Sequence, residues 1–218
     1  MPIVRSYHDG QPEYAVIQQS VAAHFFQHHK ARPQPRPDEF WSLLGPSRSL
    51  PGLASLGLCW GDRGPLFSEH YLPGRRICGH QDRSALVEIG QVASFEPGSG
   101  SRLLDLTISE LAQRNLRHVL MTATAHIRSI VNALGIPATE LGVAELRHCR
   151  DAHLDWGTYY QNDPRVILLD LQPLAQALRT DADRRRMALD RSFGPPHGAG
   201  ILSHPINPPP GVSHVVAA

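Results

Sequence analysis

Lysine is nearly absent from this chain: among its 21 Lys and Arg residues, only Lys30 is a lysine. A phosphate-binding loop of the P-loop class needs a lysine directly after a glycine, and Lys30 follows a histidine. The basic residues are balanced by 20 acidic ones, which leaves a net charge of +1. That balance supplies no general attraction to polyanions. The sequence therefore excludes P-loop chemistry and predicts no nucleic-acid partner.

Cysteines and long apolar runs are also scarce. Cys59, Cys78 and Cys149 are odd in number and far apart, a pattern that favours free thiols in a reducing compartment over a disulfide scaffold. No apolar run approaches the roughly 20 residues that span a bilayer, and the first ten residues lack a signal-peptide core. We expect a cytoplasmic protein without a transmembrane segment.

Three common kinds of site are disfavoured. The sequence has no Gly-x-Ser-x-Gly elbow of a serine hydrolase, and Gly98 and Gly100 lack the third glycine of a dinucleotide fingerprint. His24 and His28 have the i, i+4 spacing of a zinc pair, but no third ligand accompanies them. We predict no metal site and no tightly bound cofactor.

The order of elements predicts an α/β protein. Residues 13–29 have the apolar spacing of a helix, and prolines 33, 35 and 37 follow it. Residues 53–60 and 65–72 look extended on either side of a Gly-Asp-Arg-Gly turn, which predicts a hairpin. Further along, the pattern predicts alternating strands and helices over residues 85–95, 101–112, 118–124 and 125–134, with a last strand at 166–171.

Three regions follow from this pattern. Residues 1–50 are predicted to form an N-terminal helix and a proline-rich linker that pack on the core. Residues 51–191 are predicted to form the main domain. Residues 192–218 are rich in proline and glycine without apolar periodicity, so we expect a disordered tail.

Several motifs together resemble the thermostable hemolysin family. In chain order they are PLFSEHYL at 65–72, VEIGQVA at 87–93, TAT at 122–124, LGIP at 134–137 with Leu141 and Ala144, and WGTYY at 156–160 with Pro164. The resemblance covers about a hundred residues. Gln91-Val92 departs from the Asn-Leu that the family more often has, and the first sixty residues match only loosely.

The resemblance implies a fold similar to GNAT acyltransferases and acyl-homoserine-lactone synthases. In such folds helices flank a mixed central sheet, and two splayed central strands form a cleft for an acyl thioester. It further implies that the donor, an acyl-CoA or an acyl carrier protein thioester, lies along the strand and the following loop. The corresponding residues here are Ile89, Gly90, Val92, Gly98, Ser99, Gly100, Ser101 and Arg102.

Candidate catalytic residues lie nearby in the sequence. Glu88 sits among apolar neighbours on a strand expected to be central, where a buried carboxylate acquires the raised pKa of a general base. It could instead be a structural carboxylate tied to an arginine or to backbone N–H groups. Glu69 and Tyr71 would share one face of their strand, and Tyr159 or Tyr160 could protonate a departing thiolate. The alternatives are an exposed polar strand face for the first pair and simple packing for the two tyrosines.

The function that the resemblance implies is transfer of an acyl group to an amine or other small nucleophile in specialised metabolite biosynthesis. Analogy with the lactone synthases suggests a medium or long fatty chain as the acyl group. Two alternatives stay open: a membrane-active lytic protein, as the family name suggests, and a catalytically silent thioester-binding module. A lytic protein should show an export signal, a strongly amphipathic cationic helix or a long alternating hairpin, and the 13–29 helix carries only Lys30 at its end.

Overall fold

The computed structural model describes residues 3–72, 74, 77 and 80–192. Two structural units are distinguished, residues 1–180 and residues 181–218. The second unit holds the end of the last helix, and the tail expected from residue 193 onward lies outside the described residues, as does Cys78. The site and the core belong to the first unit.

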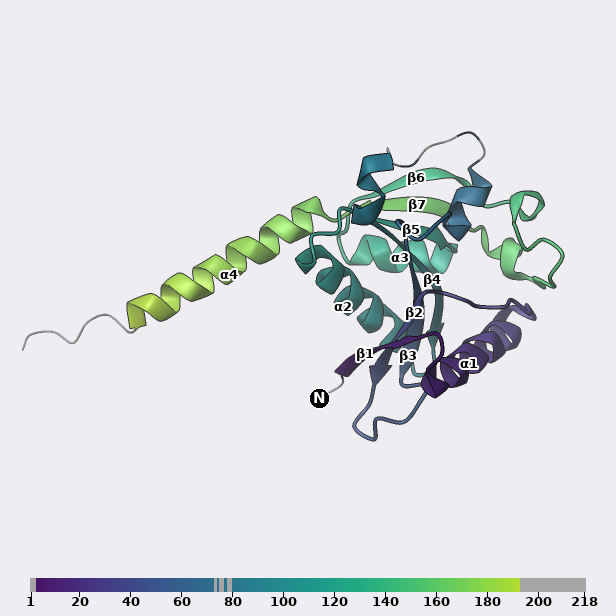
Figure 1. Cartoon of the computed structure of the whole chain (residues 1–218), viewed down its shortest axis with the longest axis horizontal. Coiled ribbons are helices and arrows are strands. Elements are labelled where there is room, and N and C mark those ends of the chain that lie inside the picture. Colours follow the sequence, from purple (N-terminus) through teal and green to yellow (C-terminus); the bar gives the residue numbers. More distant parts are fainter. Residues whose placement is uncertain (1–2, 73, 75–76, 78–79, 193–218) are drawn as a thin grey trace, which may run out of the picture. The chain divides into compact units, whose positions relative to one another are not determined.

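Within the described residues, seven strands form one mixed sheet in the order β1-β2-β3-β4-β5-β7-β6 (Figure 1). Only the β4–β5 pair is parallel; the other neighbouring strands are antiparallel. The strands are β1 Ile3–His8, β2 Glu39–Leu44, β3 Ala54–Trp60, β4 Leu86–Ser94, β5 His118–Ala123, β6 Ala138–Val143 and β7 Arg165–Asp170.

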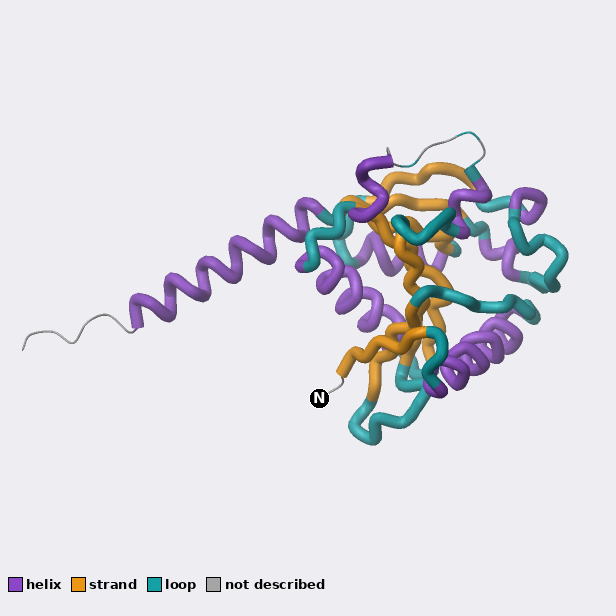
Figure 2. Tube along the Cα trace, in the orientation of Figure 1, coloured by secondary structure: helices purple, strands orange, loops and turns teal. Residues whose placement is uncertain are grey.

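The described helices are α1 Pro12–His29, α2 Ser99–Gln113, α3 Ala125–Ala133 and α4 Gln172–Ser192, with 3₁₀ turns η1 Phe67–Tyr71, η2 His80–Ala85, η3 Leu146–His148 and η4 Tyr159–Asn162. Helices α1, α2 and α3 cover the two faces of the sheet (Figures 1 and 2). The α2 and α3 side chains pack into the main core against one sheet face. On the other face α1 packs against β1, β2 and β4.

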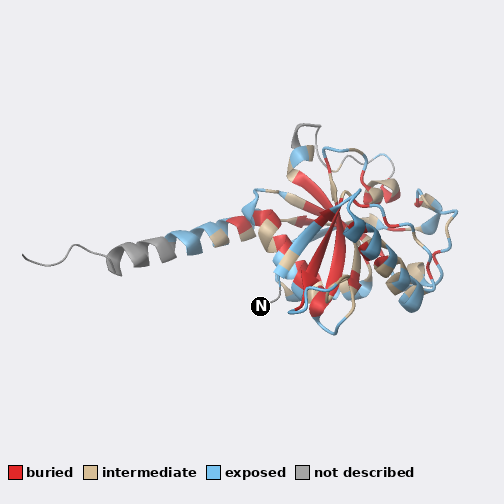
Figure 3. Cartoon of the chain, turned by 60° about the horizontal axis from the view of Figure 1, so that its bottom comes forward, coloured by how far each residue is buried: buried red, intermediate tan, exposed pale blue. Residues whose placement is uncertain are grey.

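One further layer completes the α1 face. An aromatic cluster formed by η1, η4 and residues 149–156 covers the β4–β5 end of that face. Figure 3 shows the central strands buried between these layers, while the helices expose their outer surfaces. The α/β prediction is therefore confirmed, as are the central strands β4 and β5 and the helices α1, α2 and α3.

The hairpin prediction was wrong. β3 pairs with β2 and β4, and the predicted second strand, 65–72, contains the 3₁₀ turn η1. The Glu69 side chain accepts a hydrogen bond from the Leu66 backbone N–H at 2.7 Å, and such local bonds compete with extended structure. Glu69 and Tyr71 therefore do not alternate on a strand.

Two irregularities open the centre of the sheet. The parallel pairing of β4 with β5 ends at Glu88 and Leu120, although both strands continue beyond these residues. On the other side of β4, Gln91 and Val92 lie opposite the single residue Leu56, and Gln91 has φ +52°. A bulge of this kind bends the strand that carries it. The two central strands thus separate just beyond Glu88, as the resemblance implied.

Candidate active site

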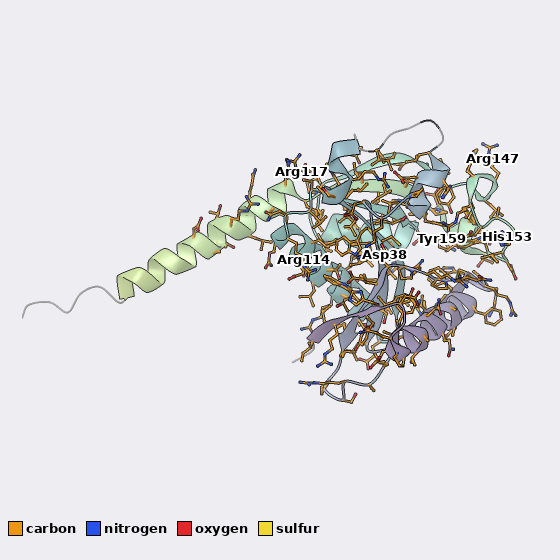
Figure 4. All side chains as sticks on the ribbon, in the orientation of Figure 1. Asp38, Arg114, Arg117, Arg147, His153 and Tyr159 are labelled. Atoms are coloured by element: carbon orange, nitrogen blue, oxygen red, sulfur yellow. The ribbon has the colours of Figure 1, made fainter. Side chains whose placement is uncertain are left out.

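A cavity of about 480 Å³ lies where β4 and β5 separate. Its floor contains Glu88, Gly90 and Gln91 of β4 together with Thr122 of β5. Its walls come from the 33–38 segment, β3, the loop before η1 and the 150–159 segment. Figure 4 labels three of the wall residues, Asp38, His153 and Tyr159, from segments far apart in the sequence. The cavity is therefore a product of tertiary structure.

The cavity is lined by both aromatic and charged side chains. Phe25, Trp60, Phe67, Trp156 and Tyr159 supply apolar surface. The charged groups include two arginine–aspartate pairs, Arg63 with Asp38 at 3.6 Å and Arg150 with Asp151 at 3.1 Å. Such a lining suits a ligand with an apolar part and a few polar contacts.

Glu88 is buried at the floor, with 4% of its surface exposed. The backbone N–H of Phe67 donates to its Oε2 at 2.7 Å, and the backbone N–H of Ser68 donates to its Oε1 at 2.8 Å. The Ser68 hydroxyl also donates to Oε1. Burial raises the pKa of Glu88, and these three bonds oppose that shift because they favour the ionised carboxylate.

The Glu88 carboxylate thus has a structural task, because it holds the start of η1 through backbone N–H groups. That is one of the two readings that the sequence left open. The general-base role stays a prediction, supported by the position of Glu88 on the cavity floor.

Glu69 binds Arg83 instead of facing the cavity. The Arg83 guanidinium donates to Glu69 Oε1 at 2.6 Å and also to the carbonyl groups of Gly61 and Gly64, each at 2.6 Å. Burial raises the pKa of Glu69, but the bonds from Arg83 and from the Leu66 N–H outweigh it, so the pKa lies below its ordinary value. This carboxylate stays ionised and fixes η1 to its neighbours.

Tyr71 and Tyr160 also lie outside the cavity lining. Their hydroxyl groups are hydrogen-bonded to each other at 2.7 Å, and Tyr71 is buried in the aromatic cluster. Burial raises the pKa of both phenols. The tyrosine that lines the cavity is the neighbouring Tyr159, so of the two candidate acids at 159 and 160 the structure places Tyr159 at the cavity.

The residues expected to hold the donor fall into two groups. Gly90 lines the cavity, whereas the side chains of Ile89 and Val92 pack toward the α2 face. The segment Gly98 to Arg102 forms the start of α2, where Gly98 has φ +74° and Arg102 is exposed. None of its residues lines the cavity.

Some of the hydrogen-bond donors at the start of α2 are already bonded to acceptors within the protein. The Ser99 N–H donates to the carbonyl of Glu96 at 3.2 Å, and the Gly100 N–H donates to the Ser94 hydroxyl at 3.2 Å. The Ser99 hydroxyl shares its one proton between the carbonyl oxygens of Leu53 and Glu96, each at 2.6 Å. These bonds leave fewer free donors for a phosphate than the glycine-rich sequence suggests.

The sequence did not single out several cavity residues for the site. Cys59 is the neighbour of Glu88 on β3, and burial followed by the Glu88 charge raises the pKa of its thiol to about 12. Ser68 and Thr122 belong to the motifs named above, but no role followed from their positions. The chain also gave no signal that residues 33–38 would line the cavity, since their prolines are typical of a linker.

The model of the thermostable hemolysin family matches residues 7–174. The chain belongs to the thermostable hemolysin family. The match includes α1 and the proline-rich segment, where the sequence motifs were weakest. A comparison with curated proteins gives no match.

Comparison with solved structures shows which fold this family member has. A CoA-dependent acyl-homoserine lactone synthase, BjaI, with SAM and isopentyl-CoA, matches with a TM-score of 0.57 and 12% identity over 84% of this chain and 89% of that chain. The synthase LasI matches with a TM-score of 0.54 and 10% identity, over 79% of this chain and 91% of that chain. A further CoA-dependent synthase, MesI, matches with a TM-score of 0.52 and 14% identity over the same two shares. At such identities the likeness establishes the GNAT-like fold.

No helix in the described ranges is both long and apolar enough to span a bilayer. Those ranges also contain no group of three His, Cys, Asp or Glu side chains arranged to hold a metal ion.

Proposed function

We propose that this member of the thermostable hemolysin family is a cytoplasmic acyltransferase of specialised metabolite biosynthesis. It moves an acyl group from a CoA or acyl-carrier-protein thioester to an amine or other small nucleophile. The observation that carries the proposal is the cavity at the point where β4 and β5 separate, with the Glu88 carboxylate on its floor.

The donor fits the opened edge of β4. Beyond Glu88, this edge has no β5 partner in the described structure, and unpaired backbone groups inside a sheet need a hydrogen-bonding partner. An extended pantetheine arm offers such a partner along Ile89, Gly90 and Val92. The CoA-bound state of BjaI supports this choice. We assign to exposed Arg102 the task of adding positive charge for the donor near the start of α2.

Two features of the cavity suit the acyl and acceptor groups. The aromatic side chains provide apolar surface for a medium or long fatty chain. Gln91 lines the cavity, and its buried Oε1 has no hydrogen-bond partner among the described residues. A buried carbonyl oxygen without a partner is costly, so we assign it to an N–H donor of the ligand.

The reaction joins an acceptor ammonium and a thioester into an amide and a thiol, with release of one proton. Glu88 takes one proton so that the neutral amine can attack the acyl carbon. The second nitrogen proton goes to the departing thiolate when the carbon–sulfur bond breaks. A buried carboxylate with a raised pKa suits the first transfer.

Replacement of Gly90 tests the location of the reaction. A Cβ atom on Gly90 would meet no heavy atom within 4 Å, and its backbone does not require glycine. We therefore expect Gly90→Ala and Gly90→Leu to fold like the wild type, since side chains in strands lower the entropy of the unfolded chain. The leucine should fill the cavity and lower acyl transfer about tenfold or more, and the alanine should lower it less.

The measurement is thiol release from a panel of acyl-CoAs and acyl-carrier-protein thioesters with amine acceptors, alongside calorimetric binding and urea unfolding. Wild-type protein that neither binds nor consumes any thioester would disprove the proposed function. Full activity of Gly90→Leu would move the reaction away from this cavity.

A further inference from the structure

A continuous series of three hydrogen-bonded side chains connects Glu88 to the cavity. The Ser68 hydroxyl contacts Glu88 Oε1 and, at 2.7 Å, the hydroxyl of Thr122. Ser68 is fully buried, whereas Thr122 is half-buried and lines the cavity. The three residues come from η1, β4 and β5, so the series crosses the gap where the two central strands separate.

The ionised Glu88 carboxylate determines which group donates in each hydrogen bond of the series. A carboxylate only accepts hydrogen bonds, so the Ser68 hydroxyl donates its proton to Glu88. Ser68 has no second proton and therefore accepts from the Thr122 hydroxyl. The lone pairs of the Thr122 oxygen are then left for a donor in the cavity, such as an ammonium group.

The Glu88 carboxylate has few acceptor positions left for a direct hydrogen bond from a substrate ammonium. Its two oxygens offer about four acceptor positions, and the bonds from Phe67 and Ser68 fill three of them. An acceptor ammonium bound at Thr122 avoids this crowding, because it needs only the free side of one hydroxyl oxygen.

On the basis of the proposed function, we propose that Thr122 and Ser68 relay the acceptor's proton to Glu88. The ammonium nitrogen gives a proton to Thr122 Oγ1 while the Thr122 proton moves to Ser68 Oγ and the Ser68 proton moves to Glu88 Oε1. Each hydroxyl thus gains one proton and loses one, the amine becomes neutral and Glu88 becomes a carboxylic acid. After the amide leaves, the same series returns the proton to solvent. Thr122 touches the substrate, and Ser68 acts through its neighbours.

Three ionisable neighbours of Glu88, namely Cys59, Tyr159 and Glu69, do not replace it as the proton acceptor. Cys59 on β3 has a pKa raised to about 12 by burial, and burial also raises the pKa of Tyr159, so both stay neutral. Glu69 on η1 has a pKa below its ordinary value and is paired with Arg83, so it stays ionised. Of the four groups, Glu88 has a raised pKa and no cationic partner among its hydrogen-bond donors, which leaves it as the proton acceptor.

Two substitutions of Thr122 test the relay. Thr122→Val keeps the side-chain shape without the hydroxyl, and Thr122→Ser keeps the hydroxyl. For an amine that is protonated at neutral pH, we expect Thr122→Val to lower kcat about tenfold to a hundredfold, at the low end of the worth of general-base catalysis. The acceptor KM should change less than about threefold, and Thr122→Ser should restore most of kcat.

A second acceptor separates proton transfer from positioning. Hydroxylamine is uncharged at neutral pH and has no ammonium proton to lose, so the defect of Thr122→Val should nearly vanish with it. An equal defect with both acceptors, or equal activity of the valine and serine variants, would overturn the relay while leaving the acyltransferase activity established.

A measurement without turnover tests the series itself. In protein with ¹³C-labelled glutamate carboxyls, the Glu88 signal is assigned by its loss in Glu88→Gln and titrated in wild type and Thr122→Val. Loss of the Thr122 donor weakens the Ser68 bond to Glu88, so the pKa of Glu88 should rise. An unchanged pKa would overturn the relay, whereas a failure of the wild type to transfer any acyl group would overturn the proposed function.

Discussion

Two glutamates on neighbouring elements show how environment divides roles between identical side chains. Glu88 receives its hydrogen bonds from uncharged donors, the N–H groups of Phe67 and Ser68 and the Ser68 hydroxyl. Glu69 receives its bonds from a guanidinium and a backbone N–H. Without a cation to offset burial, the pKa of Glu88 rises, and with Arg83 the pKa of Glu69 falls. Glu88 therefore takes up a proton at a higher pH than Glu69 does.

Glu69→Gln should therefore remove stability in a pH-dependent way. Because the pKa of Glu69 is lowered from 4.5 in the folded protein, its contribution is complete above pH 4.5 and is lost as the pH falls through the folded pKa. At pH 7 we expect the variant to be less stable by about 2 kcal/mol, the worth of a hydrogen bond to a charged group. The difference from the wild type should shrink below pH 4.5, measured as urea midpoints at several pH values.

Glu140→Gln is the matched control. Glu140 pairs with Arg165 at 3.1 Å, but its side chain is 52% exposed, so its loss should cost less than about 1 kcal/mol. A Glu69→Gln difference that stays constant from pH 7 to pH 3 would show that the charge of Glu69 contributes nothing.

The sequence could predict Glu88 but not its partners. A carboxylate between Val87 and Ile89 on a central strand had to be buried, and burial with three hydrogen bonds is what the structure shows. Ser68 and Thr122 are 54 positions apart, and their contact depends on how η1 lies across β4 and β5. Periodicity within a segment carries no information about such a contact.

Elements were predictable where a repeating pattern matched their surroundings. The helices α2 and α3 have one apolar face each and were identified. The strand β2 was missed because all six of its residues are buried, so it lacks the alternation of a half-exposed strand. The strand β6 was missed for the opposite reason, since it has no buried residue. The turn η1 was predicted as a strand because it is held by a hydrogen bond from the Leu66 N–H to the Glu69 side chain. Apolar periodicity does not reveal such a bond.

The end of α1 is fastened to the segment that forms the cavity wall. The Thr158 N–H donates to the carbonyl of His29 at 2.7 Å, and the Arg32 N–H donates to that of Asp155 at 2.6 Å. Phe25 on α1 and Tyr159 on η4 both line the cavity. The distance between these two walls therefore depends on the backbone contact at His29.

Gly157→Ala should break this contact. A Cβ on Gly157 would lie 2.1 Å from the carbonyl oxygen of His29, and the residue has φ +48°. Since backbone atoms cannot yield locally, we expect a loss of about 2–4 kcal/mol in unfolding free energy, in the range of severe steric substitutions. The acceptor KM should rise as the cavity wall moves. Urea unfolding and steady-state kinetics measure the two effects.

Gly10→Ala separates the clash from backbone strain. Gly10 also has a positive φ, +88°, but a Cβ there would meet nothing within 4 Å. It should cost only about 1–2 kcal/mol, the penalty for a side chain in left-handed backbone, with unchanged acceptor KM. Equal losses in both variants would show that the contact at His29 is not tight.

At the scale of the molecule, local patterns gave the α/β class but not the topology. They predicted the order strand, helix, strand, helix through residue 134, yet β7 enters the sheet between β5 and β6 as an antiparallel strand. This arrangement is set by pairing between distant segments. The GNAT-like fold was reached through the resemblance, and the family match over residues 7–174 confirmed the membership.

The boundary between the two structural units predicts where the chain can be shortened. The main core includes buried Ala175 of α4, and Leu174 and Leu178 pack against it. All three precede residue 181, where the second unit begins. A chain that ends at Thr180 should therefore keep the melting temperature of the full chain within about 2 °C, because truncation outside a core removes little buried surface. Differential scanning calorimetry of both chains measures this.

A chain that ends at Leu171 provides the contrast, because it lacks those three side chains. Burial of a large apolar side chain contributes roughly 1.5–3 kcal/mol, and 1 kcal/mol corresponds to about 2–4 °C in a domain of this size. We therefore expect the melting temperature to fall by about 5–15 °C. A fall of that size already in the chain that ends at Thr180 would show that residues 181–218 contribute to the stability of the core. The boundary at residue 181 would then not separate a stable unit from the rest of the chain.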